Sequence, residues 1–102
     1  MMVHVIAQMK IKEGKMEAML ALFEDLVPLV RAEAGCIRYD VCLDADVDLG
    51  APKDPLAITI VEAWESAEHL AAHLKIKHMA DFREKVGDLR ESSQVKVLSV
   101  KV

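Results

Sequence analysis

Apolar and polar residues alternate at the start of the chain. Every second residue from 3 to 11 is apolar, and the residues between them are mostly polar: the apolar set is Val3, Val5, Ala7, Met9 and Ile11. A period of two is typical of a β-strand with one buried face. We therefore expect a strand here, ended by Gly14.

From Lys15 the apolar spacing changes to three and four, which is typical of a long amphipathic helix. Its apolar stripe is Met16, Met19, Leu20, Phe23, Leu26, Val27 and Val30. Pro28 removes one backbone donor, but the stripe continues on both sides of it, so we expect a bent helix. Gly35 tolerates a left-handed conformation and closes the segment.

Two further strands are predicted at Cys36–Leu43 and Leu56–Glu65. The first should place Ile37, Tyr39, Val41 and Leu43 on one face. The second is apolar on both faces, as in a strand that is covered on both sides. Residues 44–55, rich in Asp, Pro and Gly, form the loop between them.

A second helical stripe follows Ser66, which can cap the helix. Its apolar residues are Leu70, Leu74, Met79, Phe82 and Val86. No stop signal lies between Lys75 and Lys77, so one broken helix and two short helices both stay open. Ser93–Val102 is predicted as the last strand.

The order of elements is strand, helix, strand, strand, helix, strand (βαββαβ), which predicts an α+β, ferredoxin-like fold with both helices on one face of an antiparallel sheet. We expect one domain spanning residues 1–102. The other face of the sheet is bare yet partly apolar, and 53% of the chain is hydrophobic. A homodimer formed through this face is therefore predicted.

Charge and composition argue against two classes of binding partner. The net charge is −4, basic residues do not cluster, and only 4% of residues are aromatic, which argues against nucleic acid and anionic membranes. We expect a cytoplasmic protein, because no apolar stretch could span a bilayer and no signal peptide is recognisable. Cys36 and Cys42 would be roughly 20 Å apart along one strand, too far for a disulfide.

Three of the four histidines and the only tryptophan lie between residues 62 and 82. His73 follows Leu70 by three and so lies on the apolar face, where it could exchange a proton with a bound molecule or serve as a core histidine. His78 would point about 140° away from His73 on a continuous helix. The two can meet around one ligand only if the helix breaks near Ile76.

A metal site is the weaker interpretation. His69 and His73 have the i, i+4 spacing of a helical metal pair, but Leu70 stands where the metalloprotease pattern has glutamate. We predict no metal. The candidates for a further ligand would be Glu62, His78 and Asp81.

Polar and aromatic groups on the strands complete the candidate site. Trp64 offers a flat wall and an indole donor, or ordinary core packing. Glu62 shares its strand face, and since buried acids are rare unless paired, we expect Arg38 or a helix histidine as its partner. Tyr39 could donate a hydrogen bond or simply anchor its strand.

The run Glu62-x-Trp64-Glu-Ser-x-Glu-x-Leu70-x-x-His73-x4-His78-x3-Phe82, preceded by Gly35-Cys36-x-x-Tyr39, resembles the antibiotic biosynthesis monooxygenase superfamily over nearly the whole chain. The resemblance implies ferredoxin-like dimers whose two sheets pack into a barrel. It also implies a cofactor-independent monooxygenase, in which the anion of a small quinol or anthrone reduces molecular oxygen without metal, flavin or haem. By this resemblance the base would be His73 or His78. The substrate would be held by Trp64, Glu62, Arg38, Tyr39 and Phe82.

Two alternatives remain. The superfamily contains an isomerase that acts on a phosphorylated sugar, and two histidines beside a carboxylate would also serve such proton transfers. A dimeric binding or stress-response module without catalysis would have histidines bonded to the backbone and no cavity. Haem degraders of the superfamily have tryptophan where His73 stands, so we do not expect haem.

Overall fold

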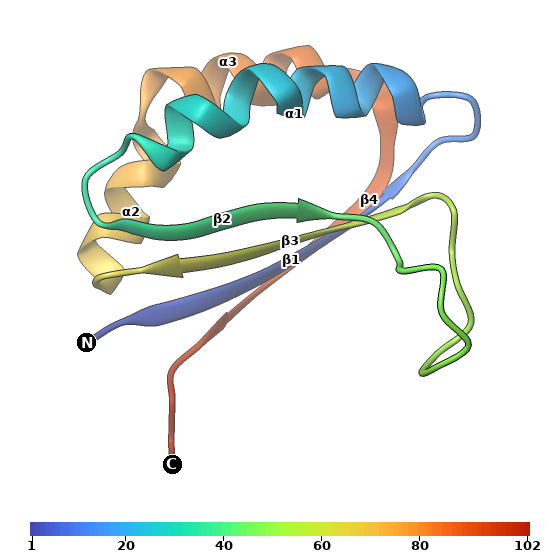
Figure 1. The fold of residues 1–102 in the computed structure, drawn as a ribbon. Helices are drawn as coiled ribbons and strands as arrows, with labels where there is room; N and C mark the ends of the chain where they lie inside the picture. The colour runs from blue at the N-terminus through green and yellow to red at the C-terminus, as the bar shows by residue number, and fades with distance from the viewer.

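The computed structural model describes residues 1–102 as a sheet covered on one side by helices (Figure 1). Its elements in chain order are β1 (Val3–Ile11), α1 (Met16–Arg31), β2 (Cys36–Cys42), β3 (Ala57–Trp64), α2 (Ala67–Lys75), α3 (Lys77–Val86), a 3-10 turn (Gly87–Leu89) and β4 (Arg90–Leu98). The strand order is β2-β3-β1-β4, and all neighbours are antiparallel. The predicted α+β, ferredoxin-like fold is confirmed.

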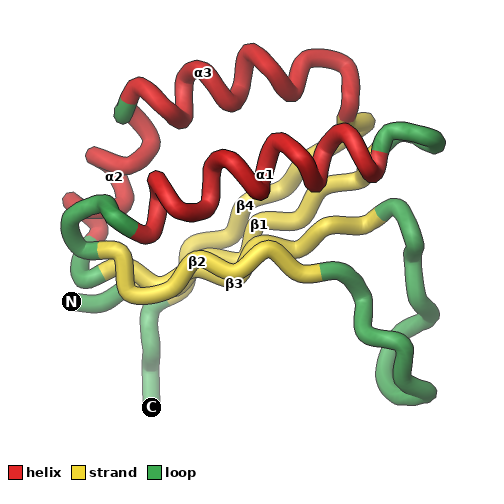
Figure 2. Tube along the Cα trace, turned by 45° about the horizontal axis from the view of Figure 1, so that its top comes forward, coloured by secondary structure: helices red, strands yellow, loops and turns green.

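The helices lie together over one face of the sheet (Figure 2). The alternation in β1 places its apolar residues beneath them, and all five predicted inward residues are buried. Opposed residues of antiparallel strands point to the same side, so the register of Val5 with Glu62 and Val97 puts those two side chains on the helix face as well. Phe23 of α1 and Phe82 of α3 pack with ring centroids 4.9 Å apart and join the helices above the sheet.

The second helical stripe is divided between two helices. Ile76 has an extended conformation, with φ −72° and ψ 149°, between the end of α2 and the start of α3. Ser66 caps α2 as predicted, since its Oγ accepts a hydrogen bond from the backbone N–H of His69. At the other end of α2, the guanidinium of Arg83 donates to the carbonyl of Leu74. This bond satisfies a carbonyl that the break would otherwise leave unpaired.

Two strand predictions need correction. The last strand covers Arg90–Leu98 and not Ser93–Val102, because the pairing of β4 with β1 runs from Arg90 opposite Ile11 to Leu98 opposite His4. In β2 the register shifts between Cys36 and Arg38. The shift leaves Ile37 exposed, although simple alternation placed it on the same face as Tyr39.

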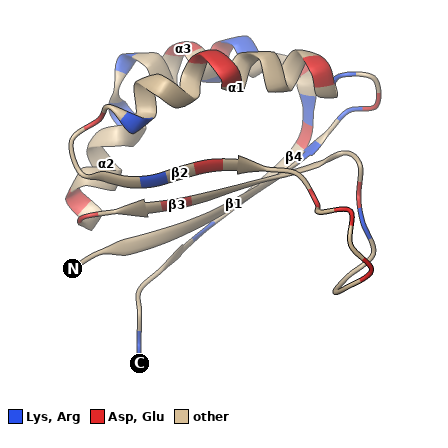
Figure 3. Ribbon diagram, in the orientation of Figure 1, with Lys and Arg blue, Asp and Glu red and all other residues tan.

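α1 runs through Pro28 without interruption. Both cysteines are free thiols. Charged residues are spread over the helices and the loop 44–55, while long stretches of the two central strands carry none (Figure 3). No helix is both long and apolar enough to cross a bilayer.

The turn between α1 and β2 depends on Gly35. Its φ is +80°, and a Cβ added there would lie 2.3 Å from the ring of His69. Gly14 has nearly the same φ, +81°, but open space around it. Gly14→Ala should therefore lower the free energy of unfolding by about 1 kcal/mol, the usual cost of a left-handed alanine. Gly35→Ala should cost a further 1–3 kcal/mol or so, as expected for overpacking.

Urea denaturation of both variants and the wild type measures this difference. Equal destabilisation of the two variants would show that the Gly35 contact with His69 does not constrain the turn.

Candidate active site

A buried carboxylate joins the two histidines of the second helical stripe. Glu33 lies in the turn after α1, and its oxygens are both 2.9 Å from Nδ1 of His73. One of them is also 2.7 Å from Nε2 of His78. The side chains of Glu33 and His73 are only 6% and 2% exposed, so this acid and this base are paired almost entirely out of water.

The break between α2 and α3 lets both histidines contact Glu33. On one continuous helix His73 and His78 would point apart, but the extended Ile76 resets the direction of α3, and both rings reach the same carboxylate. Glu33 was not among the residues predicted for the site, because it lies 40 residues from His73 in a polar turn whose pattern resembles any solvated helix end. Its only local signal is Gly35, which turns the chain toward α2.

Aromatic rings fix the position of His73. The indole of Trp64 lies against one side of the imidazole, with ring centroids 4.5 Å apart, and Tyr39 approaches edge-on at 5.9 Å. Trp64 is fully buried and donates from Nε1 to Oε1 of Glu62 at 2.9 Å. Glu62 is thus partnered by its neighbour on the same strand face, and not by Arg38 or a histidine as expected from the sequence.

A pocket of about 250 Å³ lies between the sheet and the helices α2 and α3. Most of its lining is apolar and comes from the inward faces of β1, β3 and β4 and from both helices: Val5, Ala7, Met9, Ile60, Leu70, Leu74, Met79, Phe82, Val95 and Val97. The polar lining residues are Tyr39, Glu62, His73, Arg83, Arg90 and Ser93. Val95 and Val97 are more than half exposed, so the pocket opens along β4.

Several polar side-chain atoms at this pocket are unpartnered. No hydrogen bond within the chain reaches Nε2 of His73, the second oxygen of Glu62 or the hydroxyl of Tyr39. None of these atoms is sealed from solvent either, since the structure has no buried side-chain nitrogen or oxygen without a partner. The pocket therefore offers a bound molecule an imidazole nitrogen, a carboxylate oxygen and a phenol.

Burial shifts the acid–base behaviour of two of these groups. The pKa of the Glu62 carboxyl is raised, mainly because burial disfavours its charged form, while the Trp64 hydrogen bond and nearby His73 act in the opposite direction. The pKa of Tyr39 is raised well above its usual value by burial and by the negative charges of Glu62 and Glu33. Tyr39 is accordingly a neutral hydrogen-bond donor at any physiological pH.

The structure brings most of the sequence-derived site residues together. Tyr39, Glu62, His73 and Phe82 line the pocket, and Trp64 packs directly behind His73. Arg38 does not reach this site. It is opposite Ala63 on the outer face of the sheet, where its Nε donates to Asp40 at 2.6 Å.

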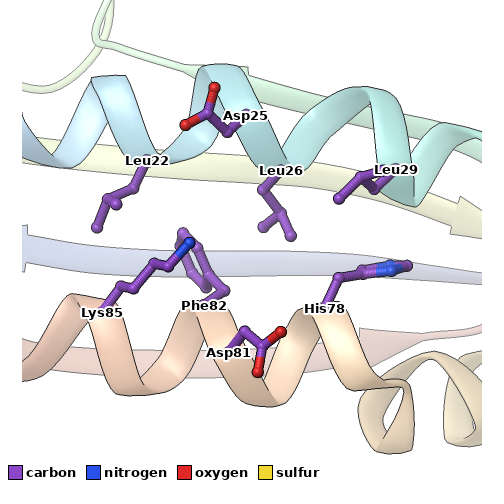
Figure 4. Close-up of a pocket in the computed structure, with 8 residues that line it drawn as sticks. All are labelled: Leu22, Asp25, Leu26, Leu29, His78, Asp81, Phe82 and Lys85. Atoms are coloured by element: carbon purple, nitrogen blue, oxygen red, sulfur yellow. The ribbon is translucent and has the colours of Figure 1, made fainter.

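His78 lines a second, smaller cavity of about 100 Å³ between α1 and α3 (Figure 4). Leucines of α1 face Phe82 across it, and charged side chains stand along both helices. Its lining is Leu22, Asp25, Leu26, Leu29, His78, Asp81, Phe82 and Lys85. Phe82 lines both cavities and forms part of the wall between them.

His69 and His73, the pair with metal-site spacing, are each hydrogen-bonded to another side chain. Nδ1 of His69 is 2.7 Å from the hydroxyl of Ser66, and His73 is bonded to Glu33. The chain presents no group of three or more His, Cys, Asp or Glu side chains placed to hold a metal ion.

Comparison with known proteins identifies the class to which this fold and site belong. The antibiotic biosynthesis monooxygenase family matches residues 2–85, and the chain belongs to this family. Among its relatives is the probable quinol monooxygenase YgiN of Escherichia coli K12, which is 36% identical over 94 residues, covering 88% of this chain and 90% of that protein.

Solved structures share this fold. Rv0793 of Mycobacterium tuberculosis superposes with a TM-score of 0.85 at 27% identity, covering all of this chain and 97% of that one. SO0527 of Shewanella oneidensis superposes with a TM-score of 0.82 at 30% identity, covering 95% of this chain and 88% of that one.

The raised pKa of Glu62 predicts how stability depends on pH. The folded state binds the carboxyl proton of Glu62 more tightly than the unfolded chain does. The contribution of Glu62 to the free energy of unfolding is therefore largest below its unfolded pKa and is lost as the pH rises through its folded pKa. Glu62→Gln keeps an oxygen for Trp64 but carries no charge. The variant should therefore gain stability relative to wild type as the pH increases from about 4 to about 8, at about 1.4 kcal/mol per unit of pKa shift.

Chemical denaturation across this pH range measures the effect, with the exposed Glu65→Gln as a control for the loss of one carboxylate. A stability difference between Glu62→Gln and wild type that does not change with pH would contradict the assigned shift.

Proposed function

We propose that this protein is a cofactor-independent monooxygenase that oxidises a small aromatic quinol. The observation that carries the proposal is the imidazole of His73, oriented by a buried carboxylate with its Nε2 unpartnered at an apolar pocket. The relative named as a probable quinol monooxygenase and the family membership support the same chemistry.

Glu33 prepares His73 to act as a base. An ionised carboxylate only accepts hydrogen bonds, so it selects the tautomer of His73 that carries hydrogen on Nδ1. The lone pair of Nε2 then faces the pocket, where it can take the proton of a phenolic hydroxyl. The nearby negative charge of Glu33 stabilises the imidazolium that results.

The pocket walls suit the rest of the substrate. Apolar side chains from the sheet and helices, with Phe82 among them, would hold an aromatic ring away from water. The neutral phenol of Tyr39 can donate to a substrate oxygen, and Glu62 can accept from a second hydroxyl. Both therefore act on the polar edge of the ring, for which Arg38 is too distant.

The reaction balances without an added cofactor. Loss of the phenolic proton makes the ring electron-rich, and the substrate anion itself transfers electrons to molecular oxygen. One oxygen atom enters the ring and the other leaves as water, so a quinol and O₂ give a hydroxyquinone and water. The protein supplies the base, the orientation and the dry pocket.

A second candidate function rests on the arginines. Arg83 and Arg90 both line the pocket, and two guanidinium groups could bind a phosphate or carboxylate. Their presence favours, as the second candidate, a proton-transfer isomerase acting on a phosphorylated carbonyl sugar. In this reaction His73 would move a proton between adjacent carbons. A non-catalytic module finds less support, since His73 is bonded to a carboxylate and lies beside a cavity.

Oxygen consumption with a panel of quinols, in the presence of a chelator, tests the proposal. Wild type should consume oxygen, and His73→Gln should lower kcat by about 10²–10⁴-fold, the usual contribution of a general base. Glu13→Gln, at an exposed position in the turn after β1, is the control and should retain activity. Absence of oxygen uptake together with isomerisation of a sugar phosphate would favour the second candidate.

We also infer that the protein is a homodimer joined through the uncovered face of the sheet. The register turns Ile6, Val61, Ala63 and Leu98 outward on three adjacent strands. Apolar side chains on a face that the helices leave open need a cover, and a second copy of the same sheet is self-complementary.

Sedimentation or light scattering should give about twice the chain mass of 11.3 kDa. Val61→Lys should shift the mass toward the monomer, because two copies would bury like charges against each other. Val47→Lys, in the exposed loop, adds the same charge elsewhere and should leave the dimer intact. A monomeric wild type would disprove the pairing.

A further inference from the structure

His78 has no part in the chemistry proposed so far. Its Nε2 is bonded to Glu33, yet its ring does not line the substrate pocket and instead faces the cavity between α1 and α3 (Figure 4). Nδ1 of His78 has no hydrogen-bond partner in the chain and is not sealed from solvent. A shared carboxylate therefore connects an imidazole at the pocket with an imidazole at a separate opening.

We propose that Glu33 and His78 form a proton outlet, which carries the proton taken up by His73 to water in the cavity between α1 and α3. Its role in turnover rests on the proposed function, in which His73 is the base. The outlet itself depends only on the three side chains and on the cavity.

The distances and the exposure of these side chains support the path. The contact from His73 to Glu33 is 2.9 Å and that from Glu33 to His78 is 2.7 Å, both within hydrogen-bond range. Side-chain exposure rises along the same sequence from 2% to 6% to 22%. Each step thus moves a proton from the buried base toward solvent without a gap.

Protons balance at every step, and no electrons move. Nε2 of His73 gains the proton of the substrate hydroxyl, and the Nδ1–H bond of His73 breaks as Glu33 gains a proton. At rest Nε2 of His78 donates to the ionised Glu33. Once Glu33 is protonated, His78 exchanges its ring hydrogen with water to the tautomer that carries hydrogen on Nδ1, and the Glu33 O–H bond breaks as the bare Nε2 gains this proton. Finally Nδ1 of His78 releases its proton to water, and reversal of these steps returns a proton to the reduced oxygen.

The groups facing His78 suit an exit. Asp25 of α1 and Asp81 and Lys85 of α3 line the same cavity. Lys77 holds the pKa of Asp81 below its ordinary value by hydrogen bonding and charge, so Asp81 stays ionised beside the opening. Carboxylates at this opening attract the released proton toward solvent.

A purely structural role is the competing interpretation. His78 would then only tie α3 to the turn after α1 through Glu33. His78→Gln separates the two roles, because the amide nitrogen of glutamine can still donate to Glu33 but cannot relay a proton near neutral pH. Lys85→Gln is the matched control, since it alters the same cavity without touching Glu33.

Exchange of the His73 Nδ1 proton with water, measured by ¹H–¹⁵N NMR on the substrate-free chain, tests the outlet directly. We expect exchange to slow at least tenfold in His78→Gln and to stay near the wild-type rate in Lys85→Gln. In His78→Ala, added imidazole should restore exchange by entering the vacated space. Equal exchange in wild type and His78→Gln would overturn the proposal.

This measurement needs no catalytic activity, so its failure is distinct from failure of the proposed function. If the chain oxidises quinols, His78→Gln should also lower kcat in dilute buffer with KM unchanged, and in His78→Ala added imidazole should raise kcat again. A kcat that stays low at every imidazole concentration would show that His78 acts on structure alone.

Discussion

The shared carboxylate of Glu33 is the contact on which the rest of the site depends. An ionised acid with 6% of its side chain exposed is costly unless donors compensate for the lost water, and here two imidazoles do so. Because Glu33 follows α1 while the histidines belong to α2 and α3, this one group fixes the relative positions of three helices. It also sets the tautomer of His73 and hence the direction of its free lone pair.

A second acid close by is used differently. Glu62 has only one neutral donor, the indole of Trp64, so burial raises its pKa, and one of its oxygens stays available to the pocket. The two glutamates therefore differ in role because of their environments: one has both oxygens bonded to histidines, and the other has an unsatisfied oxygen where a substrate would lie. The sheet makes this possible by placing Glu62 and Trp64 two residues apart on the same face.

Periodicity in the sequence predicted most of the fold. The alternation in β1 and the stripes of α1, α2 and α3 depend on burying one face of each element, so local spacing was sufficient. The break at Ile76 could not be placed, because no glycine or proline marks it and tertiary contacts decide it. The shift in β2 misled the assignment of Ile37, and Arg38 was expected at the site although it lies on the outer face. Glu33 was missed because its contact with His73 spans 40 residues.

The central claim is that His73 presents a bare Nε2 to the pocket while its Nδ1 carries the hydrogen donated to Glu33. A long-range ¹H–¹⁵N correlation spectrum of the histidine rings assigns the tautomer of each neutral imidazole. We predict that His73 is the Nδ1–H tautomer in the wild type and loses this preference in Glu33→Gln. A neutral His73 with hydrogen on Nε2 in the wild type would contradict the account.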